Sequence, residues 1–294
     1  MPRQCVLALL LCSAIGHVLH AQLGAVVADR VARLTRTTKW MRVATVPIGF
    51  NTFHPQGMVK IGGSFFVSSV EVHDRDAGKG VGHLFKINAT NGTLIADRTL
   101  GEGAIYHPGG IDYDGKDIWV PVAEYRPDSR SIVYRVNPES MAASEVLRAN
   151  DHIGAIVHDV DDGSLHGVSW GSRRFLRWTH NQRGNWVPAQ TNVNPSHYLD
   201  YQDCKYVGRH RMICGGVTEL RQTPDIPPFR LGGIDLVDLT TGRQLHQSPM
   251  LLWTANGLDM THNPLWLEAT GAGLRAYFMP EDEHSTVYVF EAVP

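Results

Sequence analysis

His54-Pro-Gln-Gly-Met58, His107-Pro-Gly-Gly-Ile111 and His152-Ile-Gly-Ala-Ile156 are three copies of one short pattern, and their repetition decides the fold. Two degenerate copies follow at His197-Tyr-Leu-Asp-Tyr201 and Thr254-Ala-Asn-Gly-Leu258, where Thr replaces His. The copies begin 53, 45, 45 and 57 residues apart. That spacing is the length of a four-stranded β-propeller blade, so the pattern predicts one blade for each copy.

The sequence between the copies is typical of short β-strands. Each copy is followed by a turn rich in Gly and Asp and then by a segment rich in β-branched and aromatic residues. These second strands are expected at Phe65–Val70, Ile118–Ala123, Leu165–Ser169, Met212–Val217 and Arg275–Met279. Long helical periodicity is absent after the first residues, apart from a short segment near Leu23–Leu34.

A leftover strand favours five blades. The last repeat reaches Pro294 before a fourth strand, whereas Trp40–Pro47 precedes the first repeat and has no blade of its own. We expect Trp40–Pro47 to complete the last blade, because closing the ring removes two exposed sheet edges. A sixth blade would require an extra sheet within Thr223–Ile234. The prolines of Thr223–Phe229 favour an insertion loop there instead.

Composition and charge narrow the class of protein. The chain has 294 residues, 43% of them hydrophobic, and a formal net charge of −2. A near-neutral charge without a basic cluster argues against a nucleic-acid partner. Arg3 and the apolar run Cys5–Ile15 are typical of a signal peptide with a cleavage site at Ala21, and no second apolar stretch follows. We therefore expect a signal peptide at residues 1–21, a single propeller domain at 22–294, no membrane span, and a secreted or extracytoplasmic monomer.

The cysteines agree with an oxidising compartment. Cys5 and Cys12 lie in the signal segment, which leaves Cys204 and Cys214 placed symmetrically about a turn at Gly208–His210. They can form a cross-strand disulfide or remain two buried thiols, and either role is structural. Asn88 and Asn91 begin two adjacent glycosylation sequons, which matter only in a eukaryotic host.

Two sets of ionisable residues are expected at one mouth of the channel. The first residue of each innermost strand and the last residue of the antiparallel second strand lie at the same end of the blade. The first set contains His54, His107, His152 and His197, with Thr254 in the fifth blade. The second set contains Glu71, Glu124, Glu219 and Glu281, with Trp170 in the third blade. Such crowding shifts pKa values, which is a common property of functional sites.

Three chemistries fit these residue types. Paired glutamates can act as acid and base on a glycosidic bond. Histidines can hold one divalent metal ion, with glutamates orienting their second ring nitrogens. A histidine base can remove a proton next to a carboxylate, as lyases do. Alternatively, the inward polar groups only hydrogen-bond to channel water, and their repetition reflects duplication of the blade.

Residues near this mouth are candidates for ligand contacts. Tyr125 and Trp170 can stack on a sugar, Arg126 can clamp a carboxylate, and Asn256 lies in the degenerate fifth copy. Packing at the surface would account for these side chains equally well. Ser169-Trp-Gly-Ser172 lacks the Gly-x-Ser-x-Gly form of a nucleophile turn, so we interpret it as core and channel lining.

Several longer segments resemble a family of microbial, often secreted propeller proteins known chiefly as a domain of unknown function. These segments are His54-Pro-Gln-Gly-Met-Val, Gly80-Val-Gly-His-Leu-Phe, Tyr106-His-Pro-Gly-Gly-Ile-Asp-Tyr-Asp-Gly, Trp119-Val-Pro-Val-Ala-Glu-Tyr-Arg-Pro, His166-Gly-Val-Ser-Trp-Gly-Ser-Arg-Arg-Phe and Phe278-Met-Pro-Glu-Asp. The resemblance covers nearly the whole mature chain and implies the propeller fold, but it carries no activity. In architecture alone, five-bladed propellers resemble arabinanase- and fructosidase-type glycosidases, which bind sugars in the same mouth.

The sequence thus predicts a hydrolase or lyase that acts on a small polar or saccharide substrate. In this hypothesis the four glutamates supply acid and base, and the four histidines bind metal or substrate. The alternative is a non-catalytic propeller that binds a small molecule or carbohydrate at the same rim.

Overall fold

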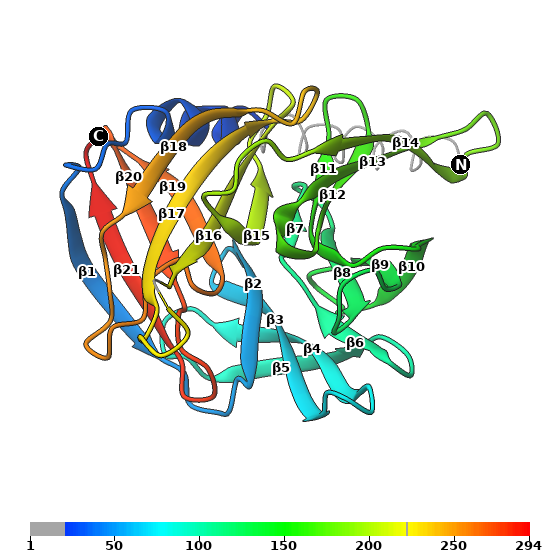
Figure 1. Cartoon of the computed structure of the whole chain (residues 1–294), viewed down its shortest axis with the longest axis horizontal. Helices are drawn as coiled ribbons and strands as arrows, with labels where there is room; N and C mark the ends of the chain where they lie inside the picture. Colours follow the sequence, from blue (N-terminus) through cyan, green and yellow to red (C-terminus); the bar gives the residue numbers. More distant parts are fainter. Residues whose placement is uncertain (1–20, 222) are drawn as a thin grey trace, which may run out of the picture.

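The computed structural model describes residues 21–221 and 223–294, which form five antiparallel sheets around a central axis (Figure 1). Blades 1 and 2 contain β2 (His54–Ile61), β3 (Ser64–Asp74), β4 (Lys79–Asn88), β5 (Leu94–Leu100), and then β6 (Ile105–Pro108), β7 (Asp112–Tyr113), β8 (Ile118–Glu124), β9 (Ser131–Val136), β10 (Ala143–Ala149). Blades 3 and 4 contain β11 (Ile153–Asp159), β12 (Ser164–Ser169), β13 (Arg174–His180), β14 (Trp186–Val193), and then β15 (Asp200–Tyr206), β16 (Arg211–Leu220), β17 (Phe229–Asp238), β18 (Gln244–Met250). Blade 5 contains β19 (Leu265–Thr270), β20 (Gly273–Phe278), β21 (Thr286–Ala292) and β1 (Trp40–Pro47). The prediction of a five-bladed propeller is confirmed.

The ring closes through the first strand, as the leftover segment predicted. β1 pairs antiparallel with β21, from Trp40 opposite Ala292 to Pro47 opposite Thr286. Figure 1 shows the two strands side by side although they lie at opposite ends of the sequence. Blade 5 is therefore built from both ends of the described chain, and β21 is paired on both sides, with β1 and with β20.

The register of the last two blades differs from the expected one. The inner strand of blade 5 begins at Leu265, whereas Thr254 to Gly257 form a turn in which Gly257 has a φ of +82°. The inner strand of blade 4 begins at Asp200, three residues after His197. The degenerate copies of the motif therefore do not mark where strand pairing begins in these two blades.

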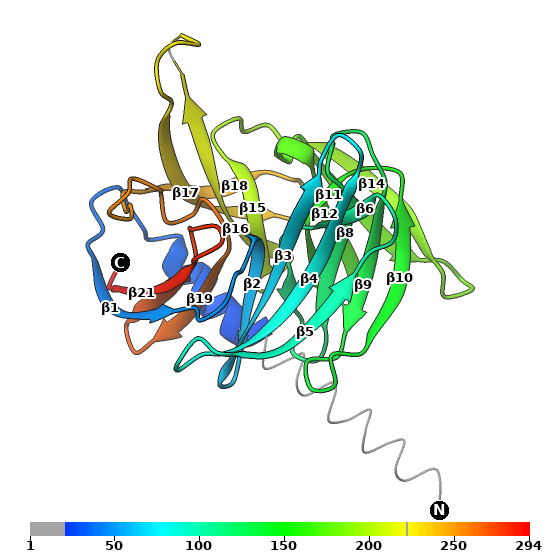
Figure 2. The same cartoon turned by 90° about the horizontal axis from the view of Figure 1, so that it is seen from below.

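The long segment of blade 4 is an insertion and not a sixth blade. β16 and β17 stay paired out to Leu220 opposite Phe229, so the two strands form a long hairpin. Figure 2 shows this hairpin projecting from one end of the ring, on the side where the short 3-10 helix η1 (Trp170–Ser172) lies. The prediction of an insertion loop at Thr223–Phe229 is confirmed for the described residues.

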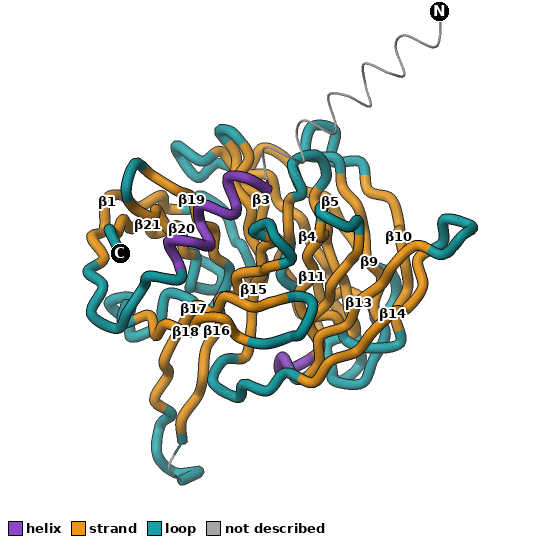
Figure 3. Tube along the Cα trace, turned by 90° about the horizontal axis from the view of Figure 1, so that it is seen from above, coloured by secondary structure: helices purple, strands orange, loops and turns teal. Residues whose placement is uncertain are grey.

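A helix at residues 21–31 covers the opposite end of the ring (Figure 3). Val27, Ala28 and Val31 of this helix are buried in one hydrophobic cluster with Leu265 of β19 and Ile213 of β16. This helix matches the short helical pattern near Leu23–Leu34. The expected signal peptide at residues 1–21 lies, apart from Ala21, outside the described residues. No helix among the described residues is long and apolar enough to cross a membrane.

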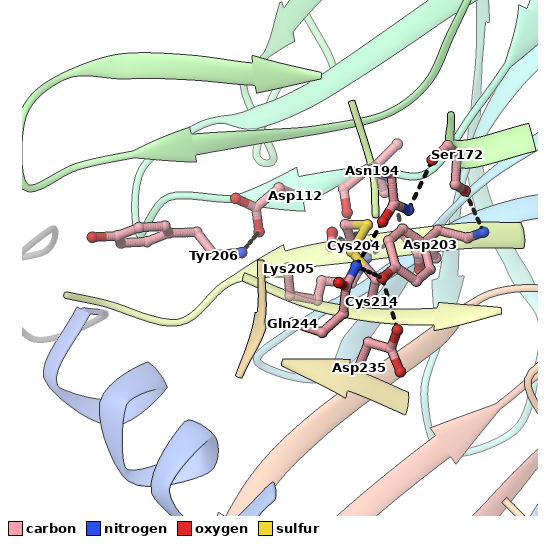
Figure 4. The surroundings of a disulfide bond; sticks show 12 residues. Asp112, Ser172, Asn194, Asp203, Cys204, Lys205, Tyr206, Cys214, Asp235 and Gln244 are labelled. Carbon is pink, nitrogen blue, oxygen red and sulfur yellow. Dashed lines mark hydrogen bonds and ion pairs between the residues drawn. A yellow bond between two sulfur atoms is a disulfide. The ribbon is translucent and has the colours of Figure 1, made fainter. Parts of the chain in front are cut away.

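Cys204 and Cys214 form a disulfide bond (Figure 4). They lie directly opposite each other on β15 and β16, with Cα atoms 4.1 Å apart. The cross-strand disulfide is therefore confirmed over the alternative of two free thiols.

A buried carboxylate ties the inner strands together in the middle of the channel. Asp203 accepts hydrogen bonds from the backbone N–H groups of Met58 (2.9 Å), Ile111 (3.1 Å) and Leu265 (3.3 Å), and it forms an ion pair with Lys205. Burial raises the pKa of Asp203 to about 6, although the Lys205 ammonium opposes the shift. Backbone groups from three other blades thus converge on the side chain of Asp203 in blade 4.

Candidate functional site

A pocket of about 240 Å³ opens at the end of the channel where the inner strands begin. Its walls come from blades 1 to 4 and include His54, His107, His152, Tyr125 and Trp170. Three of the four predicted histidines and both predicted aromatic residues therefore meet in one place. Gln56 and Asp200, which the sequence did not single out, line the same pocket.

His54 is oriented by a carboxylate from the last blade. Its Nδ1 lies 2.7 Å from Oδ1 of Asp282, and the side-chain amide of Asn263 donates to the same oxygen at 3.0 Å. Burial would raise the pKa of Asp282, but hydrogen bonds, first from His54 and then from Asn263, contribute to lowering it below its usual value. With Nδ1–H donated to Asp282, the Nε2 lone pair of His54 is available to a ligand.

His152 is oriented by a backbone carbonyl. Its Nδ1 lies 2.9 Å from the carbonyl oxygen of Glu124, which can only accept a hydrogen bond, so Nδ1 carries the proton. Burial lowers the pKa of His152, and the hydrogen bond to Glu124 only partly opposes this. The ring is therefore neutral at pH 7, and Nε2 is an acceptor.

His107 is buried and has no hydrogen-bond partner at either ring nitrogen. Its ring stacks on Tyr125 with 4.0 Å between ring centroids, and the His152 ring lies 5.6 Å away. Burial, followed by repulsion from His152 and His54, holds the pKa of His107 well below 6.5. Buried polar atoms normally have a hydrogen-bond partner. The two unbonded ring nitrogens in the pocket wall therefore indicate that a ligand or a water molecule binds there.

More unpaired polar atoms lie beside the His54–Asp282 pair. Buried atoms without a hydrogen-bond partner include Nδ1 of His262, Oδ1 of Asn263 and Oδ2 of Asp259. Burial raises the pKa of Asp259 to about 6 and, together with the charge of Arg230, lowers the pKa of His262. The polar region therefore continues from the pocket into the loop that precedes β19.

The rim of the pocket carries one cation without an acidic partner. The Arg75 guanidinium lies 3.9 Å from the centroid of the Tyr125 ring and 5.9 Å from that of Trp170. No described carboxylate forms an ion pair with Arg75. In contrast, Arg126 and Arg130 both pair with Glu124. Arg75 is thus the rim cation that remains available to an anionic ligand.

The four glutamates do not form the expected ring. Glu71 contacts His73 and His83, and Glu124 pairs with Arg126 and Arg130, whose hydrogen bonds outweigh burial and lower its pKa. Glu219 pairs with Arg221 and Arg230 on the exposed hairpin, and Glu281 accepts a hydrogen bond from Tyr288 at 2.5 Å. None of these carboxylates lines the pocket. For Glu71 the reason is strand alternation: Val70 lies directly opposite His54, so Glu71, the next residue, points to the other face.

The expected positions of His197, Arg126 and Asn256 are also wrong. His197 accepts a hydrogen bond from Arg173 at 2.6 Å outside the pocket, because β15 starts at Asp200 and places that residue at the wall. Arg126 is held by Glu124. Asn256 is exposed in the turn before β19.

The four histidines do not make a metal site in this structure. Among the described residues, only Asp159, Asp161 and His210 bring three ligand atoms within 4.8 Å of one another. Asp159 ends β11, whereas His152 precedes that strand, so this group lies at the opposite end of the blade. The candidate metal ligands are thus separate from the pocket histidines.

Solved structures with a similar fold are distant in sequence. The tail fibre of Staphylococcus aureus phage P68 is 9% identical with a TM-score of 0.50, and the match covers 90% of this chain and 55% of that chain. A GH43 endo-arabinanase from Bacillus licheniformis is 11% identical with a TM-score of 0.47, and the match covers 84% and 96% of the two chains. The β-propeller domain of the Trilobed protease from Pyrococcus furiosus is 15% identical with a TM-score of 0.34, and the match covers 81% and 69%. At these identities the similarity concerns the fold alone.

The sequence matches one family over almost its whole length. A family described as "Family of unknown function (DUF6454)" matches residues 8–294. No curated protein matches the sequence.

Proposed function

Since this chain belongs to DUF6454, a family of unknown function, we propose its function from the pocket itself: a lyase that removes a proton next to the carboxylate of a small polar substrate, such as a uronate-containing saccharide. The observation that carries this proposal is the His54–Asp282 pair at 2.7 Å beside a neutral, unpaired His107. A histidine whose second nitrogen is held by a carboxylate is an effective general base.

His54 is the base in this scheme. Nδ1–H donates to Asp282, so Nε2 takes the proton from the carbon next to the substrate carboxylate, and Asp282 stabilises the imidazolium that forms. The electron pair of the broken C–H bond forms a C=C bond as the C–O bond at the adjacent carbon breaks. The departing oxygen needs a proton, and His54 or Tyr125 is placed at the pocket to give it.

Tyr125 is the candidate acid and Arg75 the candidate carboxylate ligand. Burial raises the pKa of Tyr125 from its usual value of 10, although the charge of Arg75 opposes the shift, so its hydroxyl is protonated at pH 7. A guanidinium can hold a carboxylate through two hydrogen bonds and withdraw charge from the acidified carbon. Nε2 of His152 and the ring of His107 can accept hydrogen bonds from substrate hydroxyl groups.

The absence of the glutamates from the pocket wall favours elimination over glycoside hydrolysis. A pair of carboxylates on both sides of the scissile bond is the usual requirement of hydrolysis. Here none of the four predicted glutamates lines the pocket. Glu124 and Glu219 form ion pairs with arginines, Glu71 contacts two histidines, and Glu281 accepts a hydrogen bond from a tyrosine. The Cys204–Cys214 disulfide and the apolar run at Cys5–Ile15 support a secreted location for this enzyme.

The test is to incubate the protein with oligogalacturonides and smaller uronates and to follow the ultraviolet absorbance of the new C=C bond. We expect unsaturated product from the wild type. His54→Ala should reduce the rate by about 10²–10⁴-fold, and Arg75→Gln should mainly raise KM. Glu219→Gln is the matched control, because Glu219 is exposed on the hairpin and should leave the rate unchanged. Turnover that persists in His54→Ala would contradict the assigned base.

A second candidate, a non-catalytic ligand-binding propeller, is favoured by the stacking of Arg75 on Tyr125 and Trp170. Aromatic rings beside an arginine are a common surface for sugars and carboxylates. If uronates bind without turnover and His54→Ala keeps their affinity while Trp170→Ala loses it, the binding function is the correct one.

A further inference from the structure

We propose that Asp159, Asp161 and His210 bind a divalent transition-metal ion at the end of the propeller opposite the pocket. The three residues come from two neighbouring blades: Asp159 and Asp161 from the end of β11 and its turn, and His210 from the turn between β15 and β16. Their ligand atoms lie within 4.8 Å of one another. An ion there would join blade 3 to blade 4, independently of any chemistry in the pocket.

Hydrogen bonds between side chains and from the backbone already hold the three side chains together. Nδ1 of His210 lies 2.7 Å from Oδ2 of Asp159, and the backbone N–H of Arg209 donates to Asp161 at 2.8 Å. The backbone N–H of Asp161 donates to Asp159 at 3.0 Å. The ligands therefore need small movements of side chains, and no rearrangement of strands, to reach an ion.

A separate observation points to a missing ligand at this place. The Tyr206 hydroxyl is buried, with 2% of the residue exposed, and makes no hydrogen bond of ordinary geometry. It lies beside the Asp161 and Asp159 carboxylates, and burial together with its contacts to both raises the pKa of Tyr206. A water molecule bound to an ion between these carboxylates would give the hydroxyl a well-aligned partner.

The charges around the site leave it negative. Arg209 and Arg211 are directed to Asp29 of the N-terminal helix, at 3.9 and 3.3 Å, and no described lysine or arginine forms an ion pair with Asp159 or Asp161. His210 is the one charged partner of Asp159 among the described residues. Two carboxylates therefore share one imidazole, and a divalent cation would neutralise them more fully.

The ligand types select the class of metal. An imidazole nitrogen with two carboxylate oxygens suits Mn²⁺, Zn²⁺ or Fe²⁺, whereas Ca²⁺ prefers six to eight oxygen ligands. Asp161 is exposed and His210 is partly exposed, so the ion can enter from solvent and complete its coordination with water.

Calorimetric titration of the chelator-treated full chain with Mn²⁺, Zn²⁺ and Ca²⁺ tests whether these three residues hold an ion. We expect one Mn²⁺ or Zn²⁺ per chain, weaker Ca²⁺ binding, and a metal-dependent rise in melting temperature. Asp161→Asn and His210→Gln should each weaken binding by about tenfold or more. Asp162→Asn is the matched control, because Asp162 is the next residue but pairs with Arg177.

Three results would overturn the proposal. One is a lack of saturable binding by the wild type, which would mean that His210 is only the charged partner of Asp159. Another is equal weakening in Asp161→Asn and Asp162→Asn, which would indicate diffuse attraction to an acidic surface. The last is binding that His54→Ala abolishes and Asp161→Asn does not, which would place the metal at the pocket. Circular dichroism of each variant without metal shows whether it is folded.

Discussion

Oδ1 of Asp282 lies 2.7 Å from Nδ1 of His54, and this contact joins the last blade to the first one. The two residues are 228 positions apart in sequence, and the pairing of β1 with β21 brings their blades together. The closure of the ring therefore also assembles the pair that orients the proposed base.

This contact predicts a defined tautomer. In the wild type at pH 8, His54 and His152 should both carry the proton on Nδ1, because each donates it to an oxygen. Asp282→Ala should remove this preference in His54 and leave His152 unchanged. Long-range ¹H–¹⁵N correlation spectra of the histidine rings distinguish the two tautomers.

Glu281→Ala is the control for that experiment. Glu281 is the neighbour of Asp282 but bonds to Tyr288 and to the backbone of Thr286, so its removal should leave both rings in their wild-type tautomers. If His54 keeps the same signature in Asp282→Ala, the carboxylate does not orient it.

The recurring His motif made the five-bladed ring predictable because the strands of each blade are neighbours in the sequence. Short strands, Gly and Asp turns and a spacing near 50 residues repeat along the chain, and Trp40–Pro47 was the strand left to close the ring. The facing positions of Cys204 and Cys214 followed from their symmetry about a turn, which left a disulfide or two thiols possible. These features depend on residues close in sequence or on simple complementarity, which patterns record well.

The site was harder to predict because it depends on single-residue register. One position separates Asp282, which reaches His54, from Glu281, which faces β21, and both lie in the Glu-Asp pair that ends the Phe278 motif. Likewise, Asp200, which lines the wall, lies three positions after His197, which does not. A motif can locate the loop, but strand pairing decides which side chain enters the pocket. No pattern in the sequence pointed to Asn263 or to the position of Arg75.

The glycine of the first repeat should be intolerant of a side chain. A Cβ on Gly57 would lie 2.5 Å from the backbone nitrogen of Ile111 and 2.8 Å from Cα of Gly110, in the neighbouring blade. Because the backbone there cannot move freely, Gly57→Ala should destabilise the protein by about 1–3 kcal/mol. Urea unfolding measures the change. Gly63→Ala, where nothing lies within 4 Å, should stay within about 0.5 kcal/mol of the wild type; equal losses would show that close approach is not the reason for the glycine.

Asp203 should be the most sensitive polar residue of the fold. Asp203→Ala leaves the Lys205 ammonium buried and three backbone N–H groups without their acceptor, so we expect a loss of about 3–5 kcal/mol in the free energy of unfolding. Asp203→Ala combined with Lys205→Met removes the unpaired charge and should recover part of that loss. A double variant less stable than Asp203→Ala would contradict the assignment of the cost to the buried ammonium.

His107 should make the protein less stable as the pH falls. The folded protein keeps this ring neutral because burial holds its pKa well below 6.5, whereas the unfolded chain binds a proton there below about pH 6.5. Protonation therefore favours the unfolded state, and the contribution of His107 to stability decreases by about 1 kcal/mol between pH 6.5 and pH 5.5. His107→Gln and His107→Phe both remove the titrating ring and with it this pH-dependent contribution. The difference in free energy of unfolding between wild type and either variant should fall by that amount over this range, whatever its value at pH 7.5. Titrating groups that do not interact with His107 cancel in this difference. A difference in the free energy of unfolding that stays constant from pH 7.5 to pH 5.5 would show that the ring takes up its proton in the folded pocket.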